Sequence, residues 1–331
     1  MAAGLRSFLV LGAGLILVGA LVVILGWSRY TLPGPLGETR TVVIPRGAGV
    51  NEIARQLWRA GVLAEPYSFQ LGTRIDDTAT RLRSGEYAFA AGISPRDVAA
   101  LLALGKTVIR RVTLTEGLTT SQMLTLISAA EGLEGEIGDL PGEGDLLPET
   151  YFYTWGDARR QIVGRSRRAM ADLVAELWAK RAADLPLRTP AEAVTLASIV
   201  EKETSIGEER PRVAAVFINR LRSGMKLQAD PTVIYGLTQG RAPLDRPLSR
   251  ADLETGHRWN TYVITGLPPT PIANPGRASL EAVLRPIQSD EIFFVADGTG
   301  RHVFARTLAE HNRNVARLRE LERARAAPAA Q

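Results

Sequence analysis

An uncharged apolar segment near the N-terminus, Phe8 to Trp27, most constrains how this chain of 331 residues can fold. Its length, about 20 residues, matches the hydrocarbon core of a bilayer. Arg6 precedes the segment, and Trp27, Arg29 and Tyr30 are residue types typical of membrane interfaces. A cleaved signal peptide is the alternative, but its apolar part would be shorter, and no small-x-small cleavage site follows. The sequence therefore predicts an uncleaved transmembrane anchor within residues 1–30.

Composition removes several classes of function. The formal net charge is +5, which is compatible with an acidic polymer, anionic lipid or nucleic acid. The sequence shows no basic helix with interleaved aromatic residues, so we expect no nucleic-acid partner. The chain has no cysteine, which excludes thiolate chemistry and disulfides. Its three histidines, at 257, 302 and 311, are not spaced as a pair on one helix face, so we expect no metal site. We also expect no cofactor.

The region after the anchor reads as a linker over 31–40 and a small αβ subdomain over 41–115. A strand at 41–44, a Pro-x-Gly turn and a helix at 50–60 resemble the LysM type of glycan-binding module. The rest of this subdomain is expected to contain a helix at 66–75, a strand at 82–89, a helix at 95–104 and a strand at 108–114.

Residues 116–325 are predicted to form a second, mixed α+β domain, followed by a disordered tail at 326–331. Residues 131–145 are acidic and glycine-rich and read as a surface loop without an assigned role. Residues 225–276 read as a long polar and aromatic loop. The helices and strands expected in this domain are helices at 119–130, 157–183, 189–203, 209–222, 279–284 and 307–325, and strands at 291–296 and 302–305. The helices at 189–203 and 209–222 should form a helical hairpin.

Glu203 is the strongest candidate for chemistry. On a 3.6-residue period it shares a face with Leu196, Ile199 and Val200, whereas Glu201 lies about 200° away. A carboxyl that extends an apolar stripe should have a raised pKa, which suits a general acid at neutral pH. The competing interpretation is that Glu203 only marks the end of the helix and points to water.

Several motifs together resemble the family of endolytic murein lytic transglycosylases called MltG or YceG-like. The motifs occur in the order of the family and are Leu-Ala-Ser-Ile-Val-Glu-Lys-Glu-Thr at 196–204, Val-Phe-Ile-Asn-Arg-Leu at 216–221, Leu-Gln-Ala-Asp-Pro-Thr-Val-Ile-Tyr-Gly at 227–236, Asn-Thr-Tyr-Val-Ile-Thr-Gly-Leu-Pro-Pro at 260–269 and Phe-Val-Ala-Asp-Gly at 294–298. The resemblance implies a lyase held in the inner membrane by one helix, with its catalytic domain in the periplasm. It also implies cleavage of peptidoglycan between N-acetylmuramic acid and N-acetylglucosamine, which would end the growth of nascent glycan strands. Peptidoglycan synthases are plausible partners.

The family position of the catalytic glutamate corresponds to Glu203, the residue that the apolar stripe also selects. A lytic transglycosylase needs one carboxyl, which protonates the glycosidic oxygen and then accepts the proton of the muramoyl C6 hydroxyl. We expect polar support for the transition state and stacking on sugars from five substrate-binding candidates, with Trp259 as a further stacking residue: Gln228, Asp230, Tyr235, Asn260 and Tyr262. Each could instead make a structural hydrogen bond within its loop.

Three other functions remain open on the sequence. A hydrolytic muramidase would use Glu203 as the acid and Asp230 or Glu149 as the second carboxylate. A non-catalytic wall-binding scaffold would use the LysM-like segment and the anchor. A pyridoxal-phosphate lyase acting through Lys202 is disfavoured, since no glycine-rich phosphate cup accompanies that lysine.

Overall fold

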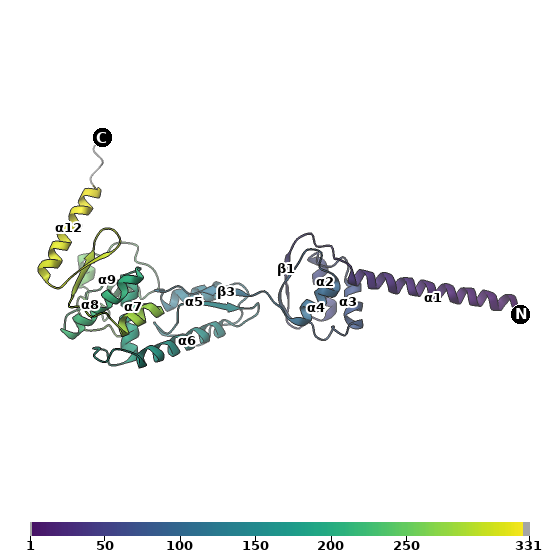
Figure 1. Cartoon of the computed structure of the whole chain (residues 1–331), viewed down its shortest axis with the longest axis horizontal. Coiled ribbons are helices and arrows are strands. Elements are labelled where there is room, and N and C mark those ends of the chain that lie inside the picture. Colours follow the sequence, from purple (N-terminus) through teal and green to yellow (C-terminus); the bar gives the residue numbers. More distant parts are fainter. Residues whose placement is uncertain (1, 327–331) are drawn as a thin grey trace, which may run out of the picture. The chain divides into compact units, whose positions relative to one another are not determined.

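The structure is a computed structural model that describes residues 2–326 (Figure 1). The chain divides into two compact units, one formed by residues 1–110 and 152–157 and the other by 111–151 and 158–331. The fold class is mixed α and β, with three two-stranded sheets among the described residues. The predicted tail lies outside the described residues except for Ala326, which ends the last helix.

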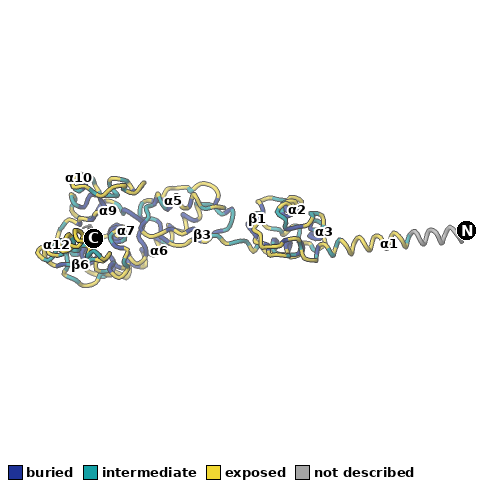
Figure 2. Tube along the Cα trace, turned by 90° about the horizontal axis from the view of Figure 1, so that it is seen from above, coloured by how far each residue is buried: buried dark blue, intermediate teal, exposed yellow. Residues whose placement is uncertain are grey.

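The first unit begins with the long helix α1 (Ala2–Thr31). Residues Gly12–Thr31 of this helix are apolar and long enough to cross a membrane, and they are largely exposed, although Tyr30 in the last turn is buried. Figure 2 shows most of the described part of this helix in the colour of exposed residues, up to its last turns. The predicted anchor therefore forms one continuous helix, and its large apolar side chains between Leu15 and Leu25 are exposed.

The remainder of the first unit packs helices against a pair of antiparallel strands. Strand β1 (Arg40–Ile44) pairs with β2 (Gly85–Phe89), with Thr41 opposite Ala88 and Val43 opposite Glu86. The helices are α2 (Val50–Arg59) and α3 (Pro66–Ile75) between the strands, and α4 (Pro95–Leu104) after them. The core consists of buried apolar side chains from all these elements, among them Ile44, Leu57, Phe69, Tyr87, Phe89 and Leu102. The predicted strand and helix positions in this region are confirmed to within a few residues.

The second unit is mostly helical. Strands β3 (Arg110–Thr113) and β4 (Thr150–Tyr153), which belong only in part to this unit, pair with each other. The helices are α5 (Thr120–Ala129), α6 (Arg159–Ala179), α7 (Pro190–Glu203), α8 (Arg210–Arg222), α9 (Asp230–Thr238), α10 (Arg250–Glu254), α11 (Arg277–Leu284) and α12 (Leu308–Ala326), with a 3₁₀ turn at Gly207–Glu209. Helices α7, α8 and α11 share a core whose fully buried members include Leu196, Ile199, Val213, Phe217 and Leu280.

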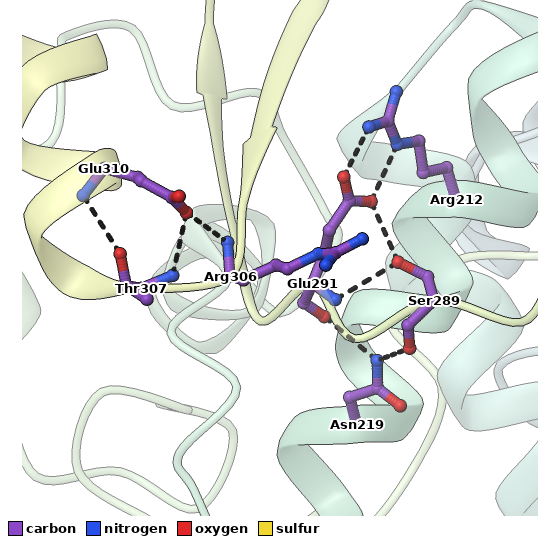
Figure 3. A network of polar contacts seen from close by, with 7 residues as sticks. All are labelled: Arg212, Asn219, Ser289, Glu291, Arg306, Thr307 and Glu310. Atoms are coloured by element: carbon purple, nitrogen blue, oxygen red, sulfur yellow. Dashed lines mark hydrogen bonds and ion pairs between the residues drawn. The ribbon is translucent and has the colours of Figure 1, made fainter.

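The C-terminal hairpin is fastened to α8 by polar contacts (Figure 3). Strand β5 (Phe293–Ala296) pairs with β6 (His302–Ala305). The Asn219 amide donates to the Ser289 carbonyl at 2.6 Å and to the Glu291 carbonyl at 3.0 Å. Arg212 binds the Glu291 carboxylate through two nitrogens, with Nε at 2.7 Å. These contacts order the segment that leads from α11 into β5.

The segment 225–276 differs from the sequence prediction of one long loop. It contains α9 and α10, which are short and lack a sustained apolar stripe. Local signals start them: Pro231 stands in the first turn of α9, and Ser249 and Asp252 form a capping box at α10. Periodicity over 11–18 residues cannot detect helices of this length.

Helix α5 offers a direct test of local stabilisation. Thr119 caps the helix, because its Oγ1 accepts from the Gln122 backbone N–H and its own N–H donates to Gln122 Oε1. The Thr119 hydroxyl also donates to the Gly240 carbonyl at 2.7 Å. We expect Thr119→Ala to lower the free energy of unfolding by about 1–2 kcal/mol. Calorimetry on the full chain measures this, with Thr125→Ala on the exposed side of the same helix as the control. Equal losses in both variants would contradict the capping role.

Candidate functional site

Glu203 is the last residue of α7, and the residues that start this helix and form its buried face determine where Glu203 lies. Thr189 caps the helix by accepting from the Glu192 N–H at 3.2 Å, and Pro190 occupies its first turn. Leu196, Ile199 and Val200 have no exposed surface. The apolar stripe that the sequence predicts is therefore a buried face, and Glu203 stands at its end.

The surroundings of the Glu203 carboxyl disfavour its ionised form. Burial raises its pKa from 4.5 to about 8; the negative charge of Asp230 adds to the shift, and Arg220 opposes it. The residue nevertheless keeps part of its surface accessible. A carboxyl with these properties carries a proton at neutral pH and can deliver it to a ligand.

Asp230 and Tyr262 lie together beside Glu203, although they are 32 residues apart in sequence. The Tyr262 hydroxyl donates to Asp230 Oδ1 at 2.6 Å, and Asp230 opens helix α9. Burial and the bond to Asp230 raise the pKa of the Tyr262 hydroxyl well above its usual value, so the tyrosine stays a donor. The pair thus presents one acceptor and one bound hydroxyl next to the Glu203 carboxyl.

Arg220 supplies the positive charge of the site. It is a buried residue of α8, and its guanidinium donates to the Ile292 carbonyl at 2.7 Å and to the Leu227 carbonyl at 2.5 Å. These backbone partners fix its position without neutralising it. Arg220 therefore remains available to offset negative charge on Glu203, with which it interacts electrostatically.

Glu201, two residues before Glu203, has a different environment. Its side chain is 4 % exposed, and Arg210 Nη2 binds it at 2.8 Å. The Gly276 backbone N–H donates to its other oxygen at 2.9 Å. Glu201 is thus a fully partnered structural carboxylate, which leaves Glu203 as the member of the Glu-Lys-Glu motif with an available carboxyl.

Two of the other residues predicted from the sequence, Gln228 and Tyr235, differ in their exposure and contacts. Gln228 is exposed, has a left-handed backbone with φ of +51°, and donates its N–H to the Thr261 carbonyl. Tyr235 is half-buried and packs edge-on against Trp259, with 5.6 Å between the ring centroids. Both aromatic residues therefore belong to one cluster in the loop-rich segment.

Asn260 differs from the expectation that it lines a sugar groove. It has no exposed surface, and its amide nitrogen donates to the carbonyls of Leu253 at 2.9 Å and Thr255 at 2.7 Å. Its Oδ1 accepts from the Tyr262 N–H at 2.9 Å. Every polar atom of the side chain is occupied, so Asn260 can only act by holding the backbone that carries Tyr262.

Glu143 lies in the site region, although its position in the sequence predicted no role for it. It is half-buried in the acidic loop, and its Oε1 accepts from the Thr120 N–H at 2.7 Å and from the Asn274 amide at 3.2 Å. Its Oε2 accepts from the Tyr235 hydroxyl at 3.2 Å. Burial raises the pKa of Glu143, and burial beside Glu143 raises the pKa of Tyr235 to about 12. An isolated Glu between two glycines carries no periodic signal that could have revealed this.

A surface groove adjoins these residues. It is a cavity of about 490 Å³ lined by residues of α7, α9 and the segment that follows α9, among them Lys202, Asp230, Tyr235, Leu244, Arg246 and Leu248. Asp230 links the groove to the Glu203 carboxyl. The arrangement combines a proton-bearing carboxyl, a second carboxylate, a fixed arginine and an aromatic cluster beside an open groove, which suits acid-catalysed cleavage of a polar polymer.

This fold and site agree with the relationships of the chain. Residues 42–317 match the YceG-like family, and the chain belongs to it. It is 29 % identical to the endolytic murein transglycosylase of Bacillus subtilis, with 83 % of both chains covered. It is 27 % identical to the enzyme of the same name from Streptococcus pneumoniae, over 83 % of this chain and 58 % of that one.

A solved structure is similar as well. The crystal structure of a YceG-like protein from Listeria monocytogenes has a TM-score of 0.51 and 28 % identity, and it covers 83 % of this chain and 99 % of that one. The family resemblance carried by the sequence motifs is therefore confirmed across most of the chain.

Proposed function

We propose that this protein is an endolytic murein transglycosylase, a lyase that cleaves peptidoglycan strands and so ends their elongation. The observation that carries the proposal is the Glu203 carboxyl: burial and the charge of Asp230 raise its pKa to about 8, and Asp230 itself lines the adjoining groove. The family membership and the names of the relatives support the same activity.

The proposed reaction uses Glu203 twice. The protonated carboxyl first donates its proton to the glycosidic oxygen between N-acetylmuramic acid and N-acetylglucosamine, and the C1–O bond breaks with an oxocarbenium-like transition state. The resulting carboxylate then takes the proton of the muramoyl C6 hydroxyl, and the C6 oxygen closes on C1. The products are a free 4-hydroxyl on one fragment and a 1,6-anhydro end on the other, and water is not consumed.

The neighbouring groups support this cycle in distinct ways. The negative charge of Asp230 lies near the developing cation. The same charge raises the pKa of Glu203 and so keeps the proton on that carboxyl. Tyr262 fixes Asp230, and Asn260 holds the loop that carries Tyr262. We assign Gln228, Tyr235 and Trp259 to contacts with the sugar chain, because the first is exposed and the other two form one aromatic cluster.

The N-terminal region is proposed to bring the catalytic unit to its substrate. Helix α1 is assigned as a single-pass anchor in the inner membrane, with the rest of the chain in the periplasm. The β1–α2–α3–β2 order supports a LysM-like glycan-binding role for residues 41–115. Release of nascent strands would place the protein near peptidoglycan synthases, which co-purification from crosslinked membranes would test.

One observation favours a second candidate, a hydrolytic muramidase. Asp230 is a carboxylate in electrostatic contact with Glu203, and two carboxylates are what ordinary glycosidases require. The chemistry of the new chain end separates the two. We expect digestion of purified peptidoglycan by the full chain in detergent to give 1,6-anhydro ends by mass spectrometry. Reducing ends that take up ¹⁸O from labelled water would establish the hydrolase instead.

The pH dependence gives an independent test of the acid role. Glu203 must be protonated for the first step, so the cleavage rate should fall as the pH rises through about 8. Asp230→Asn removes a charge that raises this pKa, and the alkaline limb should therefore move to lower pH. The measurement is the initial rate of release of soluble fragments between pH 5 and 10. A limb at the same pH in both proteins would show that Asp230 does not set the pKa of Glu203.

A further inference from the structure

Helix α3 exposes a row of large apolar side chains in the first unit. Tyr67, Leu71 and Ile75 follow one another at four-residue spacing, so they lie on one face of the helix, and they are 74, 57 and 61 % exposed. The opposite face contributes the fully buried Phe69 and Thr73 to the unit. Helix α3 therefore exposes three large apolar side chains on the face that also carries Arg74, in addition to the apolar Phe69 that it buries.

Helix α3 packs directly against the anchor helix. Gly72 of α3 contacts the ring of Tyr30, and a Cβ at Gly72 would lie 2.3 Å from that ring. Tyr30 is 1 % exposed, and its ring lies 5.9 Å from that of Trp27. Arg96 of α4 stands over the Trp27 ring at 6.0 Å. The last turn of α1 and helix α3 thus pack as one piece.

Between the two helices runs an apolar groove of about 360 Å³. Its walls come from the outer face of α3 and from the part of α1 that includes Val22, Leu25 and Trp27. These α1 residues belong to the segment that is long and apolar enough to span a bilayer. The exposed face of α3 is therefore continuous with the surface that α1 presents to lipid.

The groove also has the side chains found at the edge of a bilayer. Trp27 and Tyr67 line it, and both are amphipathic aromatic residues that favour the headgroup level. Arg29 and Glu65 line it too, and Arg74 is exposed on α3. The Glu65 carboxylate accepts from the backbone N–H groups of Tyr67 and Ser68 at the start of α3, and the two arginines can meet lipid phosphates. Apolar residues thus stand beside aromatic and basic ones, the combination found at a membrane interface.

We propose that the outer face of α3 inserts into the interface of the bilayer that α1 spans, and that the groove between them holds an acyl chain of a phospholipid. The proposal rests on the assignment of α1 as a membrane anchor. The glycan-binding candidate region would then be held at a fixed tilt against the membrane surface instead of hanging from a free tether.

The absence of native cysteine allows a direct test by site-directed spin labelling. The full chain is reconstituted into vesicles of phosphatidylethanolamine and phosphatidylglycerol with one nitroxide at Ile75→Cys. Ile109→Cys is the matched control: Ile109 is an equally apolar residue of the same unit, 70 % exposed, and does not line the groove. Leu17→Cys, on the exposed surface of α1, reports the anchor itself.

Collision with oxygen and with a water-soluble nickel chelate measures depth at each label. We expect the labels at 17 and 75 to be accessible to oxygen and at least fivefold less accessible to the chelate than the label at 109. A label at 75 that behaves like the one at 109, while 17 is protected, would overturn the proposal and leave the anchor intact. A label at 17 that is open to the chelate would overturn both assignments.

A second copy of the chain is the rival occupant of the face. Dilution of the labelled Ile75→Cys protein with an excess of unlabelled protein separates the two occupants. If lipid covers the face, the spectrum at 75 stays free of dipolar broadening at every dilution. Broadening that disappears on dilution would show chain-to-chain packing there and would overturn the lipid assignment.

Discussion

Glu203→Gln is expected to lower the rate of peptidoglycan cleavage by about 10²- to 10⁴-fold, the range that a positioned general acid contributes. Glutamine nearly matches the shape of the side chain but can neither deliver the proton to the glycosidic oxygen nor accept one from the C6 hydroxyl. The measurement is the release of soluble muropeptide fragments by the purified full chain at pH 7, below the pKa of about 8 for the acid.

Two controls make this result specific. Glu208→Gln changes a carboxyl that is 82 % exposed in the segment after α7, and it should keep the wild-type rate. The Glu203→Gln protein should unfold at pH 8 at a temperature no lower than wild type. In the unfolded chain Glu203 ionises near pH 4.5, whereas in the folded protein it stays protonated up to about pH 8. The wild-type protein therefore loses stability as the pH rises between these values, and the glutamine variant does not. A Glu203→Gln protein with near-wild-type cleavage would remove Glu203 from the mechanism.

Glu201→Gln is expected to lower the free energy of unfolding by about 3–5 kcal/mol. Glu201 is the close partner of Arg210 at 2.8 Å, and its side chain is 4 % exposed, whereas the second partner of Arg210, Glu116, is 3.4 Å away and 43 % exposed. Loss of the charge at 201 leaves a largely buried guanidinium without its main counter-ion, which is costly. Chemical denaturation of the full chain, followed through the transition of the second unit, measures the loss.

The matched comparison is Glu176→Gln, which removes an exposed i,i+4 partner of Lys180. It should cost less than about 1 kcal/mol, because solvent screens such pairs. Similar losses in the two variants would mean that Glu201 has no special structural role. The two glutamates of one tripeptide are thus predicted to differ in kind: the first holds the fold and the second carries the chemistry.

Local patterns in the sequence predicted what lies within one helix or one turn. The orientation of Glu203 follows from three apolar residues on the same helix. Helices α9 and α10 were missed because they are too short for a periodic pattern to show.

Contacts between distant residues could not be predicted in this way. Glu143 binds Thr120, Tyr235 and Asn274, which lie 23, 92 and 131 residues away along the chain. The burial of Asn260 depends on the carbonyls of the loop that folds around it. Whether a polar side chain faces a groove or the interior is decided by such tertiary contacts, and composition alone is the same in both cases.

A titration of the Glu203 carboxyl itself tests the central claim most directly. The full chain, labelled with ¹³C at the glutamate carboxyls, is followed by NMR between pH 3 and 10, and the signal absent from the Glu203→Gln spectrum is assigned to Glu203. We expect a midpoint near pH 8. A midpoint near 4.5 would mean that the carboxyl is ionised at neutral pH, and a single proton-donating glutamate could not then begin the reaction.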